Sequence, residues 1–176
     1  MYFFIKIIIP ALAEFYYNDV ELIRLGVSEM TIQFRIAKYL SNFIEPKCNL
    51  RIDCEYNRNM YNIKKINEDN VRPDIICHKR NSDKCNLFVI ELKKEDPNTD
   101  LEKIKKYVND PTYAYKYGYC ISNITENDFN VYSYPQSIIF PNGIYKFRVQ
   151  RTNTSCKIII PNSPPYLFTS PGPRPR

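Results

Sequence analysis

Several patterns that decide a protein's class at once are missing from this sequence. Its 176 residues contain a single histidine, and its six cysteines include no CxxC pair and no histidine at zinc-finger spacing. No apolar run approaches the length of a membrane span, and no segment repeats along the chain. These absences exclude a zinc finger or ribbon, a membrane-spanning helix and a repeat array.

The apolar start, MYFFIKIIIPALAEF, is similar to a secretory leader only superficially. The run after Lys6 covers residues 7–13 and contains Pro10, which is short for the core of a signal peptide. We expect a strand or short helix here. We also expect a cytoplasmic, intracellular protein whose cysteines are reduced and mostly buried. A secreted disulfide protein is the alternative, and a count of free thiols separates the two.

Basic side chains are in excess. The chain has 25 Lys and Arg against 19 Asp and Glu, a net charge of +6. A positive charge favours an anionic partner such as nucleic acid. Part of the lysine content reflects a general richness in Ile, Asn, Lys and Tyr, so charge alone does not assign a function.

The hydrophobic pattern predicts one domain over residues 1–160, followed by a proline-rich segment, 161–176, that is extended or disordered. A helix should begin after Ser28, a good N-cap, and end at Pro46. A second helix should begin after Thr99, a candidate N-cap, and end before Pro111.

Strands should alternate with these helices. The expected strands are residues 49–57, 74–79, 86–93 and 117–122, with an antiparallel meander from residue 128 that includes SIIF and a PNG turn. The polar residues 57–71 read as a loop, and the alternating tyrosines of residues 113–119 as a strand with buried rings. Strands that are apolar on both faces need cover on both sides. We therefore expect an α/β or α+β fold, with a central mixed β-sheet flanked by helices and a C-terminal antiparallel strand extension.

The expected strands 74–79 and 86–93 flank RNSDKC, and they should form an antiparallel hairpin. The expected register pairs Lys79 with Asn86 and Ile76 with Val89. Continued outward, it places Asp74 opposite a glutamate of the second strand, with Cβ atoms about 5 Å apart.

That glutamate is Glu91, and Lys93 shares its face because residues two apart on a strand point the same way. Two close carboxylates repel each other and raise each other's pKa, and a divalent cation removes this repulsion. Mg²⁺ accepts a few carboxylates while it keeps waters and substrate phosphate in its shell. The strand end is therefore a candidate Mg²⁺ site.

The stretch RPDIICHKR…NLFVIELKK resembles the PD-(D/E)xK motif of the restriction-endonuclease-like nuclease superfamily. Pro73 and Asp74 match the PD, and Glu91, Leu92 and Lys93 match the ExK. The resemblance covers residues 26–122. It implies a restriction-endonuclease-like core in which Asp74 and Glu91 bind Mg²⁺, with Mn²⁺ able to substitute, and Lys93 serves the attacking water. The Leu92 backbone carbonyl lies between these residues and is a further candidate ligand.

The family often adds a glutamate on the helix before the first core strand, and Glu29 fits this position. Gln33, one turn later, is a candidate contact to a metal-bound water or a phosphate. Each assignment has a simpler alternative. Asp74 after a proline suits a strand-entry turn, Glu91 and Lys93 suit a solvated strand end, and Glu29 suits the helix dipole.

The other charged side chains of the two helices are interpreted as solvated, and the single histidine as structural. These residues are Arg35, Lys38, Lys103, Lys105, Lys106 and His78.

The sequence thus predicts a Mg²⁺-dependent nuclease that hydrolyses phosphodiester bonds, with DNA favoured over RNA and endonuclease over exonuclease. Its partner is nucleic acid and not a membrane, and a homodimer is compatible with the sequence. The alternative is a non-catalytic nucleic-acid-binding or scaffold protein that retains the nuclease fold. Metal-induced stabilisation distinguishes the nuclease from the non-catalytic protein, because a cation that binds the folded acid pair must raise the melting temperature.

Overall fold

The computed structural model describes residues 4–59, 62–66, 69–82, 84–94, 98–135 and 144–159, with residues 69, 98 and 99 described for their backbone only. The expected strand SIIF, the PNG turn and the proline-rich segment 161–176 lie outside these residues.

A seven-stranded mixed sheet forms the centre of the molecule, in the order β1-β6-β7-β8-β9-β10-β11. Only β7 and β8 pair in parallel; every other neighbouring pair in this sheet is antiparallel. The strands are β1 (Arg51–Cys54), β6 (Ile75–His78), β7 (Asn86–Lys93), β8 (Tyr117–Ser122), β9 (Asp128–Tyr134), β10 (Ile144–Arg151) and β11 (Cys156–Ile159). The predicted α+β class and the antiparallel C-terminal strands are confirmed.

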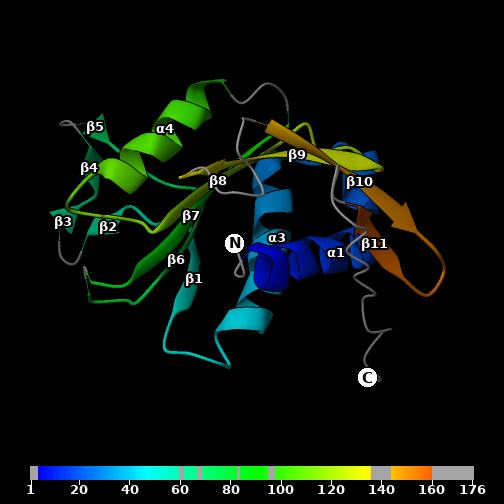
Figure 1. Ribbon diagram of the computed structural model, residues 1–176, viewed down its shortest axis with the longest axis horizontal. Coiled ribbons are helices and arrows are strands. Elements are labelled where there is room, and N and C mark those ends of the chain that lie inside the picture. The colour runs from blue at the N-terminus through cyan, green and yellow to red at the C-terminus, as the bar shows by residue number, and fades with distance from the viewer. Residues whose placement is uncertain are drawn as a thin grey trace.

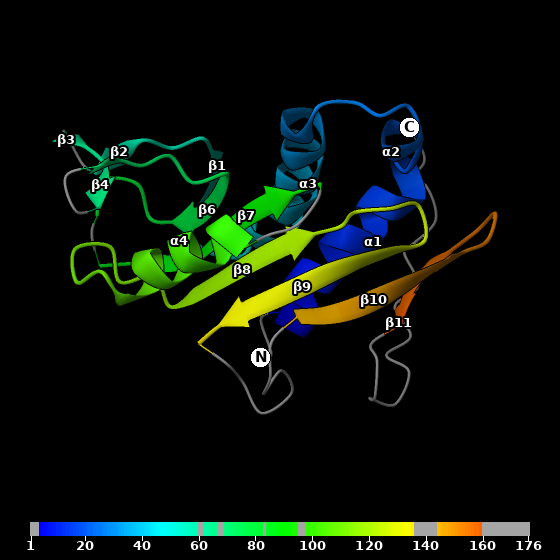
Figure 2. The same ribbon diagram turned by 90° about the horizontal axis from the view of Figure 1, so that it is seen from above.

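Helices cover both faces of the sheet (Figures 1 and 2). Helix α4 (Asn98–Asn109) contacts β7, β8 and β9 on one face. On the other face, α3 (Glu29–Ile44) contacts β1 and β7, while α1 (Ile9–Asn18) contacts α3, β10 and β11. A short helix, α2 (Glu21–Arg24), joins α1 to α3. The apolar strands are therefore covered on both sides, as their sequences require.

Helix α3 follows its sequence signals closely. Ser28 is the N-cap, and its side-chain oxygen accepts a hydrogen bond of 3.3 Å from the Thr31 backbone N–H. Helix α4 differs at its start. It begins at Asn98, so Thr99 lies within the helix and the predicted N-cap is wrong. Asp100 supplies the first-turn acid that complements the helix dipole, so a threonine cap is not required.

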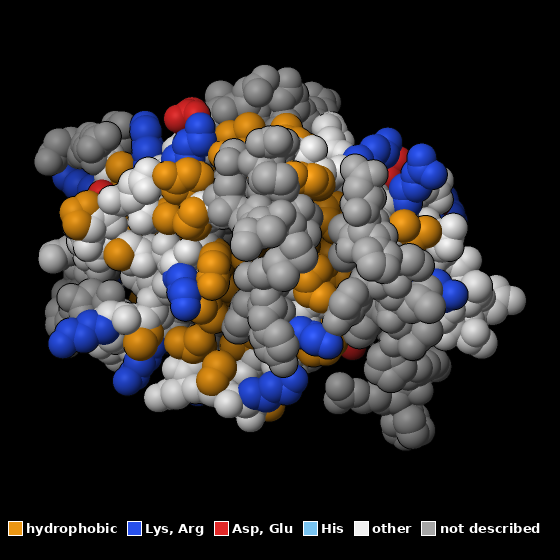
Figure 3. Space-filling model, in the orientation of Figure 1, with side chains coloured by type: hydrophobic (Ala, Val, Ile, Leu, Met, Phe, Trp, Pro, Cys, Tyr) orange, Lys and Arg blue, Asp and Glu red, His pale blue; other side chains and the backbone are white. Residues whose placement is uncertain are grey.

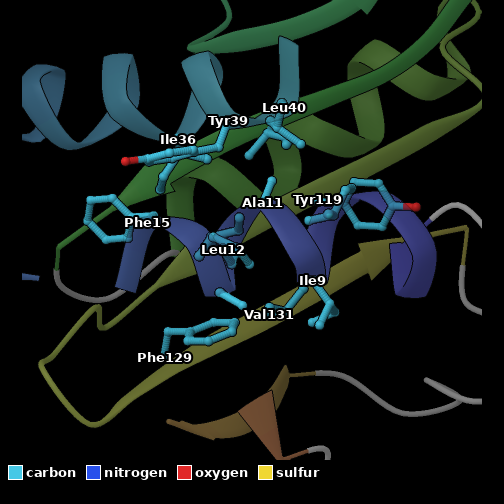
Figure 4. Close-up of a cluster of buried hydrophobic side chains, with 14 of the residues drawn as sticks. Ile9, Ala11, Leu12, Phe15, Ile36, Tyr39, Leu40, Tyr119, Phe129 and Val131 are labelled. Carbon is cyan, nitrogen blue, oxygen red and sulfur yellow. The ribbon is translucent and has the colours of Figure 1, made fainter. Parts of the chain in front are cut away.

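The apolar start of the chain is helical and lies at the centre of the core. A π-helical turn, Phe4–Ile8, leads into α1. Pro10 stands in the first turn of α1, directly after the π-helical turn. In Figure 4 the side chains of α1 lie between those of α3 and those of the sheet. The labelled residues are Ile9, Ala11, Leu12 and Phe15 of α1, Ile36, Tyr39 and Leu40 of α3, and Tyr119, Phe129 and Val131 of the sheet.

The polar stretch expected to be a loop forms two short hairpins. Strands β2 (Arg58–Asn59) and β3 (Asn62–Ile63) form one, and β4 (Lys65–Ile66) and β5 (Asp69–Asn70) form the other. Their sequences carry no apolar alternation, and long-range contacts hold them, since Ile66 is buried against Tyr113 and the Tyr113 hydroxyl bonds to the Lys65 backbone. The expected strand 49–57 is correspondingly shorter and ends at Cys54.

The tyrosine-rich stretch before β8 is only partly extended. Tyr113 and Tyr115 are buried as expected, but the strand begins at Tyr117 because Ala114 adopts a positive φ of 42°. Further along, α4 approaches β8 closely at Gly118. A Cβ there would lie 2.1 Å from the Ile104 side chain, so glycine sets the distance between this helix and the sheet.

Two further expectations concern the chain as a whole. Among the described residues, no helix combines the length and apolar character needed to cross a membrane. All six cysteines are free. Three of them are buried, Cys77, Cys120 and Cys156, while Cys48 and Cys85 are exposed.

Candidate active site

The hairpin of β6 and β7 forms as predicted at its acidic end. Ile76 faces Val89 in the expected register. At the loop end the prediction is wrong, because His78 rather than Lys79 faces Asn86. An irregularity after Cys77 shifts the register by one residue on that side. The shift lies beyond the acids and does not affect them.

Asp74 lies just outside β6 and is fixed by three neighbours. Its Oδ2 accepts a hydrogen bond of 2.7 Å from the backbone N–H of Leu92. This side-chain contact takes the place of the next backbone hydrogen bond between β6 and β7. Its backbone carbonyl accepts hydrogen bonds from the Glu55 N–H at 3.0 Å and from Gln33 Nε2 at 2.5 Å. Gln33 belongs to helix α3 and therefore fixes the backbone of Asp74 beside the first strand of the hairpin.

The same arrangement presents a carbonyl oxygen. Within a strand, the N–H and C=O of one residue face the same neighbouring strand. Since the Leu92 N–H points to Asp74, the Leu92 carbonyl also lies on that side of β7, beyond Ile75, the first residue of β6. The β6–β7 ladder stops at this point, because Asp74 lies outside β6.

Glu91 points to the opposite face from Leu92 and lies under α4. Its side chain is only 1% exposed, and its Oε2 accepts a hydrogen bond of 2.7 Å from Lys103 Nζ. Its Oε1 is buried and has no hydrogen-bond partner among the described residues. The hydroxyl of Tyr107, one helical turn after Lys103 on α4, also has no hydrogen-bond partner among the described residues. These two atoms are positions where an ion or a water would complete the polar contacts.

Lys103 is the residue that sequence reasoning missed. It was expected on a solvated face of α4, but it lies over the sheet beside Glu91 and 3.7 Å from Asp100 Oδ1. Its spacing offers a weak signal: Lys103 is three residues from Asp100 and four from Tyr107, both of which are buried. Residues at this spacing share a helix face, so buried polar neighbours on the same face were the available clue.

Arg35 of α3 is a second such case. It was expected to be solvated, but its guanidinium binds the Asp19 carboxylate at 2.6 and 2.8 Å and lies near the Tyr39 hydroxyl. This cluster ties α3 to the end of α1. Lys38 and Lys106 are exposed, and Lys105 pairs with Glu102 at the surface, as expected for solvated positions.

Glu29 and Lys93 lie at the same end of β7 without touching the acid pair. Glu29 Oε2 accepts a hydrogen bond of 2.9 Å from the backbone N–H of Lys94, which anchors the start of α3 to the end of β7. Lys93 Nζ lies 3.9 Å from Asp100 Oδ2, and its side chain is 42% exposed. Among the described residues, no direct contact joins either side chain to Asp74 or Glu91. His78 is structural, since its Nε2 lies 2.9 Å from Asp53 Oδ2.

Burial perturbs both acids. It raises the pKa of Asp74 to about 6, against the opposing effects of the Leu92 N–H and Lys103, and Glu55 and Glu29 raise it further. Burial, followed by the charge of Asp74, raises the pKa of Glu91 to about 8, although Lys103 acts in the opposite direction. Both carboxyls therefore titrate closer to neutral pH than ordinary acids do, a property typical of functional carboxylates.

These shifts predict how stability depends on pH. A carboxyl with a raised pKa stabilises the fold at and below its unfolded value of about 4, and this contribution is lost as the pH rises through the folded values. Without metal, we expect the melting temperature to fall by several degrees between pH 5 and pH 8.5 relative to a Glu91→Gln variant. Thermal melting of both proteins in EDTA measures the difference. Parallel pH profiles would contradict the raised pKa of Glu91.

The acids match the donor set that Mg²⁺ prefers. Among the described residues, no group of three or more His, Cys, Asp or Glu could hold a metal by itself. Mg²⁺ does not need one, because it binds through one or two carboxylates and retains waters. Asp74, Glu91 and the Leu92 carbonyl would hold the ion, and the unpartnered Glu91 Oε1 is the oxygen most in need of it.

Comparisons of the chain with protein-family models, with curated proteins and with solved structures found no match. The arguments about function therefore depend on the fold and on the side chains at the end of β7.

Proposed function

We propose that this protein is a Mg²⁺-dependent endonuclease with a restriction-endonuclease-like core, and that its substrate is DNA. One observation carries the proposal: Asp74 and Glu91 converge at the open end of the β6–β7 hairpin, with one buried carboxylate oxygen unpartnered among the described residues. The order of α3, the hairpin, α4 and β8 supports the same core.

Each residue has a separate role in the proposed reaction. When bound, the metal supplies the Lewis acidity that activates a water and neutralises charge on the phosphate. Lys93 positions the attacking water and offsets the negative charge that the phosphate gains. Lys103 favours the ionised form of Glu91, the form that binds a cation. Glu29 contacts a metal-bound water or a second ion.

A nucleic-acid substrate is supported by charge. The net charge is +6, and on the face seen in Figure 3 the Lys and Arg side chains form several separate groups, with few acidic side chains among them. If these side chains contact a phosphate backbone, binding should weaken as salt rises.

A second candidate function has its own observation. Lys103 already neutralises Glu91 at 2.7 Å, which suits a nucleic-acid-binding or scaffold protein whose acids serve the fold. In that case the ion pair is structural, and a divalent cation has no reason to bind.

The test combines metal binding with cleavage. We expect Mg²⁺ and Mn²⁺ to raise the melting temperature at pH 8, and more so than at pH 6, because the acids must lose their protons to bind a cation. Supercoiled plasmid should be nicked or linearised with Mg²⁺ and left intact with excess EDTA. Metal binding without cleavage of circular or linear DNA would favour the scaffold, and cleavage in EDTA would place the activity elsewhere.

A further inference from the structure

Lys64 is a buried lysine without an acidic partner. It lies between β3 and β4 and is only 3% exposed. Its Nζ donates a hydrogen bond of 2.8 Å to the Tyr115 hydroxyl. Among the described residues, no carboxylate lies within ion-pair distance of it. A buried ammonium group is costly unless a counter-charge accompanies it, so this position needs an explanation.

Three tyrosine rings surround the ammonium group. Nζ lies 5.7 Å from the ring centroid of Tyr56, 5.1 Å from that of Tyr113 and 5.2 Å from that of Tyr115. The Tyr113 ring is held in place by two hydrogen bonds of 2.7 Å between its hydroxyl and the backbone of Lys65. Ring faces attract a cation, but they accept no conventional hydrogen bond. An ammonium group has three donors, and the described contacts use one.

Lys64 also lines a small polar pocket. Besides Lys64 and tyrosines, its lining includes Arg58, His78, Asn81, Ser82 and Asn86, with no Asp or Glu among the described lining residues. The free space is about 10 Å³, roughly that of one water or one ligand oxygen. The pocket is therefore positively charged and sized for a single oxygen.

Two of the lining groups can donate toward such an oxygen. Arg58 carries a permanent charge and a fork of N–H donors suited to oxyanions. Ser82 Oγ accepts a hydrogen bond of 3.2 Å from the Lys84 backbone N–H, which leaves its own hydrogen to donate. His78 is engaged with Asp53 through Nε2. Burial lowers the pKa of Lys64 to about 8, a shift that a bound anion would reverse.

We propose that this pocket is a phosphate-binding site in which one phosphate oxygen enters between Lys64 and Arg58. It is separate from the acid pair. His78 stands four residues from Asp74 along the first hairpin strand, roughly 13 Å at the usual strand rise. The proposal does not depend on nuclease activity, and the phosphate can belong to a free ion or to a nucleic acid.

The first experiment compares inorganic phosphate with chloride at matched ionic strength. We expect phosphate to raise the melting temperature of the wild type by a few degrees more than chloride does. Lys64→Met should lose this difference, with phosphate affinity reduced at least tenfold. Methionine keeps the length of the side chain and packs well against aromatic rings. Lys65→Met, at the exposed neighbouring position, is the matched control and should behave as the wild type. Equal effects of phosphate and chloride, or a full response in Lys64→Met, would overturn the proposal.

A second measurement does not depend on the variant's folding. In wild-type protein labelled with ¹³C-lysine, the Lys64 side-chain resonance should titrate near pH 8 in chloride and at a higher pH in phosphate. An unchanged titration contradicts phosphate binding at this position.

Short oligonucleotides then identify the source of the phosphate. If a 5′-phosphorylated strand displaces inorganic phosphate and its 5′-hydroxyl form does not, the pocket recognises a terminal phosphate. Equal competition by both supports the nucleic-acid backbone, and competition by neither, with phosphate still bound, supports a free phosphate ligand.

Discussion

Asp74→Asn should reduce Mg²⁺-dependent DNA cleavage by at least about 10³-fold and remove the Mg²⁺-induced rise in melting temperature. The neutral amide takes away one of two carboxylates that would hold the ion, and metal ions of this kind contribute several kcal/mol of charge stabilisation. The substitution keeps an oxygen that can accept the Leu92 N–H hydrogen bond. Asparagine is therefore a better test than alanine, which would break this contact as well as remove the charge.

Single-turnover cleavage of plasmid and thermal melting with and without Mg²⁺ measure the two effects together. Lys105→Ala, on the exposed part of α4, serves as a control and should cut as the wild type does. If Asp74→Asn still cuts DNA, or still binds Mg²⁺ with wild-type affinity, the acid pair is not the metal site.

Lys93→Ala should lower cleavage by about 10²–10³-fold, a typical cost of losing one group that stabilises transition-state charge. Its effect on metal binding should be small, because an ammonium group repels a cation rather than ligating it. Its contact with Asp100 is long, at 3.9 Å, and Lys103 also pairs with Asp100, so the acid keeps a partner and little stability is at risk. The two parameters to compare are the cleavage rate at saturating Mg²⁺ and the Mg²⁺ concentration that gives half-maximal cleavage.

Lys103→Met is the matched comparison, because Lys103 contacts the site from α4 instead of from β7. It should strengthen Mg²⁺ binding, because the substitution removes a positive charge that lies 2.7 Å from Glu91 Oε2 and competes with the metal for this oxygen. If cleavage instead fails in Lys103→Met and survives in Lys93→Ala, the lysine that serves the reaction is Lys103, and the role given to Lys93 is wrong.

Local patterns predicted the acid pair well. The alternation of apolar residues in two short segments, with a turn between them, is enough to pair Ile76 with Val89 and so to bring Asp74 near Glu91. The α3 helix was equally predictable, because the Ser28 cap and the buried stripe are both local signals.

The missing parts depend on contacts that are distant in the chain. Lys103 meets Glu91 because the close approach at Gly118 sets α4 against the sheet. The sequence periodicity of α4 alone does not predict which of its lysines will face an acid on β7. Likewise, the burial of Lys64 depends on tyrosines some 50 residues away, and its own surroundings in sequence are polar.

The position of α1 has a consequence for the order of folding. Tyr16 hydrogen-bonds to the backbone of Asp128, 112 residues away, and α1 packs against β10 and β11. The first helix therefore reaches its final contacts only after the last strands have been synthesised, and such long loops are slow to close. A fragment cut to the motif-bearing residues 26–122 would lack α1 as well as β10 and β11, so the acid-bearing motif belongs to a folding unit larger than itself.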